Sequence, residues 1–122
     1  MSPEDEVRIR HIVDAAQEAV AFAQGQTRES LEADHMRALA ITRLLEIVGE
    51  AATTMSPELK AAHPEIPWRV MAATRNRLIH AYFNVDLQIV LDTTQSDLPL
   101  LILNLEALLS SELANKPENK TG

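Results

Sequence analysis

Apolar side chains recur along this chain at intervals of three and four residues, and that spacing predicts amphipathic helices. Ser2 and Pro3 stand before the first such set as a capping hydroxyl and a first-turn proline, and Gly25 follows it as a helix terminator. We therefore expect the first helix to begin at Ser2 and to end before Gly25. Its buried stripe would consist of Ile9, Ile12, Val13, Ala16, Val20 and Ala23.

A second helix is expected from about Asp34 to Met55, because apolar side chains repeat there with the same spacing. Gly49 lies inside this segment. A glycine in the middle of a helix costs about 1 kcal/mol relative to alanine, so its presence indicates that another helix approaches closely. Ser56 and Pro57 then predict a short helical turn that reaches about Ala62.

The second half of the chain predicts two longer helical segments. Pro67 is placed to open the first of them. The leucine-rich series from Leu87 to Leu108 keeps one helical register across Pro99. A bent helix explains that register better than two unrelated helices. Because a proline inside a helix costs about 3 kcal/mol, a break near Asp97 is the alternative.

The composition points to the same fold class. Apolar residues make up 46% of the 122 residues, yet the aromatic ones are only Phe22, Trp68, Tyr82 and Phe83. A core built from Leu, Ile, Val and Ala favours helices packed on helices, and this length allows one core. We expect an all-α, up-down bundle of four to five helices, with a single domain over residues 1–113 and a flexible polar tail over 114–122.

Composition and charge also exclude several classes of protein. The chain has no cysteine, which excludes disulfides and thiolate zinc sites. The acidic N-terminal segment does not resemble a signal peptide, and no apolar run reaches the roughly 18 residues that cross a bilayer, so we expect a cytoplasmic protein without membrane contact. The formal charge of −7 argues against sequence-independent nucleic-acid binding. Any RNA contact must be local, around Arg69, Arg75 and Arg77.

The segment RNRLIHAYF carries most of the functional information, because it places Arg75, Asn76, His80 and Tyr82 within eight residues. Arg75 lies seven residues after Trp68 and is expected on the same core-facing stripe. An arginine in that position needs a paired, hydrogen-bonded setting, since an uncompensated buried charge costs several kcal/mol.

The spacing of the motif indicates more than one helix at the site. Arg75 and His80 are five residues apart and therefore diverge by about 140° on a straight helix. One such helix cannot aim both side chains at one phosphate. Either the helix unwinds near residues 81–84, or a second copy packs across a two-fold axis and supplies the missing group. We favour the homodimer, because two-fold assembly is the commonest for small proteins.

The pattern of Arg75, His80 and Tyr82, with Asn76 beside the arginine, resembles the HEPN superfamily and within it the HepT-like toxins. The resemblance extends to IVGEAA at residues 47–52, IPWRVMAATRNRLIHAYF at residues 66–83, and the leucine-rich stretch that contains DLP at residues 97–99. It covers most of the chain from about 34 to 109. Ala73, Thr74 and Ala81 stand where related sequences often have glycine or methionine, which bears on how closely helices or substrate approach.

The resemblance implies a HEPN-like homodimer that acts as a metal-independent endoribonuclease without a cofactor, on RNA and with tRNA as a candidate target. It further implies a partner antitoxin, a minimal nucleotidyltransferase that transfers AMP to the motif tyrosine. Carried over to this chain, the catalytic residues would be Arg75, Asn76 and His80. Tyr82 would be the AMP acceptor.

The chemistry of these residues fits that activity. RNA is cut without a metal when its 2′-hydroxyl attacks the adjacent phosphate, provided that a base removes the proton and a cation stabilises the oxyanion. His80 is suited to proton transfer near neutral pH, and Arg75 can contact phosphate oxygens bidentately. Asn76 would orient the imidazole or the phosphate, and Arg77 is either a surface residue or a phosphate-positioning one.

Each residue also has a structural interpretation. His80 is then a hydrogen-bonded histidine at a helix end, Tyr82 a packed tyrosine, and Arg75 the ion-pair partner of Glu46 or Glu50 on a solvated helix face. The alternative function is a non-catalytic helical module that binds a nucleotide or a protein in the same dimer cleft. A metal site is not expected, because the remaining histidines show no ligand spacing with His80: His11, His35 and His63.

Overall fold

The computed structural model describes residues 1–78 and 86–114, and within these ranges the chain is helical with no strand. The all-α prediction is therefore confirmed. Four longer helices are joined by short ones in the described part of the chain. In order, the elements are α1 (Pro3–Ala23), α2 (Arg28–Ala33), α3 (His35–Thr53), α4 (Pro57–Ala62), α5 (Trp68–Leu78), α6 (Leu87–Asp92), the π-helical turn η1 (Thr93–Asp97) and α7 (Leu98–Ala114).

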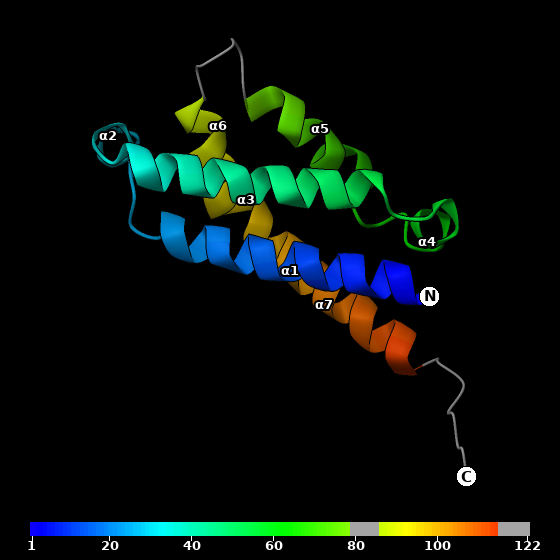
Figure 1. Cartoon of the computed structure of the whole chain (residues 1–122). Helices are drawn as coiled ribbons and strands as arrows, with labels where there is room; N and C mark the ends of the chain where they lie inside the picture. The colour runs from blue at the N-terminus through cyan, green and yellow to red at the C-terminus, as the bar shows by residue number, and fades with distance from the viewer. Residues whose placement is uncertain (79–85, 115–122) are drawn as a thin grey trace.

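The long helices form a bundle in which α3 occupies a central position. Helices α1 and α3 lie side by side and run in opposite directions, α5 packs on α3, and α7 crosses behind α1 (Figure 1). The start of α1, the short helix α4 and the last turns of α7 gather at one end of the molecule. Helices α2 and α6 lie at the other end, and α5 runs between the two ends (Figure 1).

Local capping explains where the helices begin. The Ser2 hydroxyl accepts a hydrogen bond from the backbone N–H of Asp5 at 3.1 Å. The Asp34 carboxylate accepts one from the N–H of Arg37 at 3.1 Å. The Ser56 hydroxyl accepts one from the N–H of Leu59 at 3.2 Å, and Pro57 follows as the first helical residue. The predicted starts of α1, α3 and α4 are thus confirmed, since each cap satisfies an N–H that has no partner inside its helix.

The apolar faces of these helices meet in one core. Its side chains are almost all Leu, Ile, Val, Ala and Met, as the composition predicts, and the first turn of α5 adds Trp68. Burial of a Leu, Ile, Val or Met side chain stabilises the fold by about 1.5–3 kcal/mol relative to the exposed state. The largest fully buried ones come from all four long helices, α2 and α6: Ile9, Ile12, Leu31, Ile41, Leu45, Leu78, Val90 and Leu105.

A continuous helical path leads from α6 through η1 to α7 and contains Pro99 in its α7 portion. Proline lacks a backbone N–H, and its ring collides with the carbonyl four residues earlier in a regular α-helix. The π turn immediately before Pro99 widens the helix at that place and accommodates the ring. The prediction of one helical path across Pro99 is confirmed, and the break considered near Asp97 does not occur.

Helix α2 was not predicted from the sequence. This helix has only six residues and buries Leu31, while a reciprocal pair of hydrogen bonds between Thr27 and Ser30 caps its start. No described helix is long and apolar enough to cross a membrane. The tail expected over residues 114–122 begins at the last residue of α7, and its residues 115–122 lie outside the described part of the chain.

Candidate active site on α5

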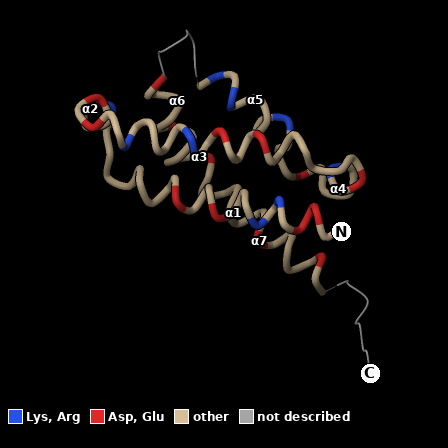
Figure 2. The backbone as a smooth tube through the Cα atoms, in the orientation of Figure 1, with Lys and Arg blue, Asp and Glu red and all other residues tan. Residues whose placement is uncertain are grey.

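Helix α5 carries the first part of the predicted motif. Arg75, Asn76 and Arg77 lie in its last described turn, and all three are exposed. The helix contains three arginines and no acidic residue, so it stands out as a basic segment on an acidic protein (Figure 2). His80 and Tyr82, the predicted base and AMP acceptor, lie outside the described residues. Their assignment remains a prediction from the sequence.

The buried stripe of α5 differs from the one predicted. It consists of Trp68, Met71, Thr74 and Leu78, and the Arg75 side chain is 47% exposed at its edge. Thr74 can occupy the buried position because its hydroxyl donates a hydrogen bond to the Val70 carbonyl at 2.8 Å. The prediction that Arg75 faces the core was therefore wrong, and its charge needs no buried counter-charge.

The absence of a side chain at Gly49 allows α3 to pack closely against α5, the helix that carries Arg75. A Cβ atom built on Gly49 would lie 3.1 Å from the Met71 carbonyl oxygen and 3.2 Å from the Arg75 Cβ. Both distances are shorter than ordinary contacts between non-bonded carbon or oxygen atoms. The close approach predicted from the mid-helix glycine is confirmed, and the helix that approaches is the one that carries Arg75.

The acid next to Gly49 holds the guanidinium of Arg75. One Arg75 nitrogen lies 3.9 Å from a Glu50 carboxylate oxygen, while Arg43 lies 3.4 Å from the same oxygen and 4.0 Å from Glu46. Of the two predicted structural partners of Arg75, Glu50 is the one observed. An exposed ion pair of this length contributes at most about 1 kcal/mol. A phosphate can therefore compete for Arg75 without breaking a strong interaction.

The two residues that follow Arg75 have no polar partner among the described residues. Within the described residues, neither the Asn76 amide nor the Arg77 guanidinium makes a hydrogen bond or an ion pair. One-residue steps on a helix are about 100° apart, so Asn76 and Arg77 point to different sides of α5. Asn76 likewise lies about 100° from Arg75 around the helix, and it shares a side of α5 with Arg69, seven residues earlier. Arg77 lies on the side of Val70, seven residues earlier.

A groove borders α5 on the Val70 side. It has a volume of about 300 Å³ and is enclosed by α3, α5, η1 and α7, with Leu45, Met71, Thr74 and Leu101 among its lining residues. Val70 and Leu100, which also line it, are 55% and 61% exposed. Large apolar side chains exposed together often mark a surface that a partner covers.

The other polar groups considered in the sequence analysis are placed away from the motif. His63 has its Nε2 2.7 Å from a Glu112 oxygen and its Nδ1 3.3 Å from a Glu65 oxygen, at the opposite end of α5. Across residues 1–78 and 86–114, no three His, Asp or Glu side chains gather in a metal-ligating arrangement. Lys60, which was not predicted as a site residue from the sequence, lies near Arg69 at a hollow beside α5.

Comparison with known proteins identifies the family. The model of the family described as "Ribonuclease HepT-like" matches residues 12–108, which is most of the chain. A protein of Thermococcus cleftensis named "Probable ribonuclease HepT" is 41% identical over 95 residues, which cover 75% of this chain and 86% of that protein. No solved structure matches the chain significantly.

Two further relatives align over nearly their whole length. A protein of Caldanaerobacter subterraneus subsp. tengcongensis, named "Putative RNase", is 30% identical over 85% of this chain and 93% of its own. Another with that name from Methanocaldococcus jannaschii is 27% identical over 96% of this chain and 98% of its own. The chain therefore belongs to the HepT-like ribonuclease family.

Proposed function

We propose that this member of the family is a toxin that cuts RNA without a metal, using Arg75, Asn76 and His80. The observation that carries the proposal is the setting of Arg75: it is half-exposed, held by Glu50 only at 3.9 Å, and next to an Asn76 that has no partner among the described residues. A buried structural arginine would need short, saturated hydrogen bonds, whereas the half-exposed Arg75 makes only the long contact with Glu50 among the described residues. This one is available to a ligand.

The reaction needs only groups that the motif contains. His80 removes the proton of the RNA 2′-hydroxyl, whose oxygen then attacks the adjacent phosphorus. Arg75 stabilises the charge that develops on the non-bridging oxygens. The bond from phosphorus to the 5′-oxygen breaks and that oxygen takes up a proton, which leaves a 2′,3′-cyclic phosphate and a 5′-hydroxyl.

We propose a homodimer as the active form. The divergence of Arg75 and His80 on one helix supports it, because a second copy would supply the group that the first cannot aim. The exposed Val70 and Leu100 at the rim of the groove support it independently, since burying them against a second copy would remove apolar surface from water. Sedimentation at micromolar concentration tests this assembly, and a monomer would contradict it.

Control of the toxin would lie at Tyr82. We propose that a minimal nucleotidyltransferase joins the Tyr82 oxygen to the α-phosphorus of ATP and releases pyrophosphate. The added phosphate would repel RNA, and the nucleotide would obstruct the site. Co-expression with the partner should add the mass of one or more AMP groups, and Tyr82→Phe should prevent the addition while leaving a ribonuclease. A Phe variant that the active partner still silences would contradict this role.

The test of the nuclease uses purified, unmodified protein and RNA. We expect full cleavage in EDTA and products that end in a cyclic phosphate. His80→Ala should lose cleavage while it keeps the helical circular dichroism and the oligomeric state of the wild type. Cleavage that EDTA abolishes and magnesium restores would contradict the mechanism. An unmodified wild type that binds but never cuts RNA would favour the alternative, a non-catalytic binding module.

A further inference from the structure

A hollow lies beside the first turns of α5, away from Arg75. It has a volume of about 650 Å³ and is formed where the end of α3, the helix α4 and the start of α5 meet. Thr53, Lys60, Trp68, Arg69 and Ala72 are among its lining residues, and none of the residues that line it is acidic. On a protein with a formal charge of −7, such a surface is unusual.

The two cations of the hollow differ from nearly all the others in the described part of the chain. Lys60 and Arg69 make no ion pair there, and the only other described cationic side chain without one is Arg77. Their charges are therefore available to an external anion. Six arginines do lie within 4.0 Å of a carboxylate oxygen: Arg8, Arg10, Arg28, Arg37, Arg43 and Arg75.

The hollow is aligned with the motif. Arg69 and Asn76 are seven residues apart on α5, so they lie within about 20° of each other around the helix and about 10 Å apart along it. Ala72 and Ala73 occupy the surface between them. Their short side chains leave a path along the helix from the hollow to Asn76 and Arg75.

We propose that the hollow binds a backbone phosphate of the RNA substrate, a few nucleotides from the one that is cut, through Lys60 and Arg69. This inference rests on the proposed ribonuclease function and adds a second contact with the same strand. Contacts with phosphates position RNA without reading its sequence. Because such a contact is made equally in the bound substrate and in the transition state, it should lower KM and leave kcat unchanged.

Binding to 2′-O-methyl RNA tests the proposal with the complete protein, because this RNA lacks the attacking hydroxyl and is not cut. The test variant is Lys60→Ala with Arg69→Ala. The control is Arg10→Ala with Arg28→Ala, which removes the same charge from exposed pairs on α1 and α2. Fluorescence anisotropy compares mixed-sequence RNAs of about 12 and about 4 nucleotides, a range typical of single-strand sites.

We expect the test variant to lose at least about tenfold in affinity for the longer RNA and little for the shorter one. Its plot of log K against log salt should become shallower by about 1.4, because each phosphate contact on a single strand contributes about 0.7. The control should lose less than about twofold in affinity. Equal affinities of the test and control variants, or equal losses for both RNAs, would overturn the inference.

Cleavage assays separate this inference from the proposed function. A wild type that cuts RNA, together with a test variant that has raised KM and unchanged kcat, supports both. If the wild type cuts and the test variant has wild-type kinetics and binding, the inference alone fails. If the wild type binds RNA through Lys60 and Arg69 but never cuts, the nuclease proposal fails instead. A variant that loses only a protein partner, with RNA affinity unchanged, also overturns the inference.

Discussion

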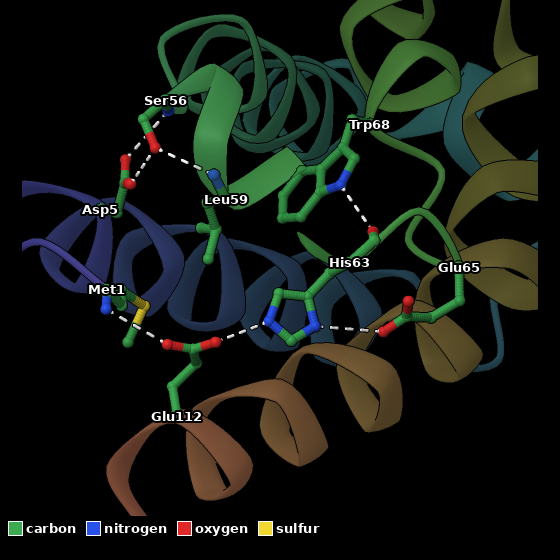
Figure 3. Close-up of polar contacts among 8 residues, drawn as sticks. All are labelled: Met1, Asp5, Ser56, Leu59, His63, Glu65, Trp68 and Glu112. Atoms are coloured by element: carbon green, nitrogen blue, oxygen red, sulfur yellow. Dashed lines mark hydrogen bonds and ion pairs between the residues drawn. The ribbon is translucent and has the colours of Figure 1, made fainter. Parts of the chain in front are cut away.

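The first turn of α5 is hydrogen-bonded to the connector at His63, which itself reaches α7, whereas the last described turn of α5 carries three polar side chains with one long ion pair among them. The Trp68 indole N–H donates to the His63 carbonyl at 3.0 Å, and the His63 ring reaches Glu112 on α7 (Figure 3). The Ser56 hydroxyl and backbone N–H both donate to Asp5 of α1, which fixes the start of α4.

The last described turn has a different construction. Arg75 approaches Glu50 only at 3.9 Å, and neither Asn76 nor Arg77 has a partner among the described residues. A short, buried hydrogen bond holds one conformation, whereas an exposed charge can exchange water for a ligand at little cost. We infer that the first turn of α5 sets the position of the helix, and that its last turn is left free to bind and react.

The largest expected effect is on catalysis at the free end. Arg75→Ala should reduce RNA cleavage by about 10² to 10³, the usual loss when one group that stabilises a developing oxyanion is removed. The free energy of unfolding should change by less than about 1 kcal/mol, because the ion pair is long and exposed. Single-turnover cleavage and urea denaturation measure the two effects.

Arg43→Ala is the matched control for Arg75→Ala, since Arg43 contacts the same Glu50 oxygen from α3. It should keep most of the activity. If both variants lose activity equally, activity depends on the ion pairs that Glu50 makes with Arg43 and Arg75, rather than on a direct role of Arg75. If Arg75→Ala unfolds the protein, the contrast between the two ends of α5 is wrong.

At the attached end the largest expected effect is on stability. Asp5 is buried and accepts two hydrogen bonds from Ser56, and Arg8 lies 3.6 Å away. Asp5→Asn should cost about 2 kcal/mol of unfolding free energy, as hydrogen bonds to a buried charged group usually do. Asp14→Asn, on an exposed part of α1, should cost nearly nothing, and RNA cleavage at a temperature where both variants are folded should be unchanged.

Acid should remove the contribution of Asp5. Burial by itself would raise the pKa of Asp5, but the hydrogen bonds from Ser56 and Ser2 and the charge of Arg8 outweigh it and lower the pKa below its ordinary value. A carboxyl whose pKa is lower in the folded state stabilises the protein above its unfolded pKa, near about 4, and loses this contribution as the pH falls through the folded pKa. The stabilities of wild type and Asp5→Asn should therefore converge as the pH falls through the folded pKa of Asp5.

A smaller effect is expected at Glu112. The hydrogen bond from His63 lowers the pKa of Glu112 against the opposing effect of burial, with a further contribution from the Met1 amine. Glu112→Gln should cost about 0.5–1 kcal/mol at pH 7, because an uncharged acceptor remains. The cost should vanish as the pH falls through the folded pKa of Glu112. Glu106→Gln on the same helix is the control, and an equal cost there would show that the His63 contact is not responsible.

The parts of the fold that the sequence predicted are those determined by neighbouring residues. Helix starts followed from Ser2, Asp34 and Ser56, because a capping side chain acts within its own first turn. Gly49 predicted a close helix for a steric reason that holds in any fold. The helix α2 was missed because its six residues show no apolar periodicity, although Thr27 and Ser30 have the spacing of a reciprocal cap.

The candidate site was predicted less completely, because it depends on how the helices pack. The helical repeat gives the angle between Arg75 and Trp68 around α5, but it does not give the limits of the buried stripe. Thr74 extends that stripe, because its hydroxyl donates a hydrogen bond to the backbone. Lys60 comes near Arg69 only after α4 has been placed beside α5. The motif itself was recognisable from local spacing. The family assignment is confirmed, while the roles of His80 and Tyr82 stay predictions.

The smallest stability effect is expected for Gly49→Ala. This variant tests whether the packing of α3 on α5 determines the position of Arg75. Alanine should gain about 1 kcal/mol of helix propensity. The new Cβ would meet the Met71 carbonyl at 3.1 Å and the Arg75 Cβ at 3.2 Å, and overpacking of this kind costs at least about 1 kcal/mol. The two effects should nearly cancel in urea denaturation.

RNA cleavage by Gly49→Ala should fall, even though the two effects on the free energy of unfolding nearly cancel. Neither atom that the new Cβ meets belongs to the far end of a flexible side chain, so α5 itself has to move by a few tenths of an ångström. Because a misplacement of about 1 Å can cost about 10²-fold in rate, a shift of a few tenths of an ångström should lower kcat several-fold while the wild-type stability is kept. A variant that is more stable than the wild type and equally active would show that the approach at Gly49 does not position Arg75. The orientation of that arginine would then have to come from Glu50.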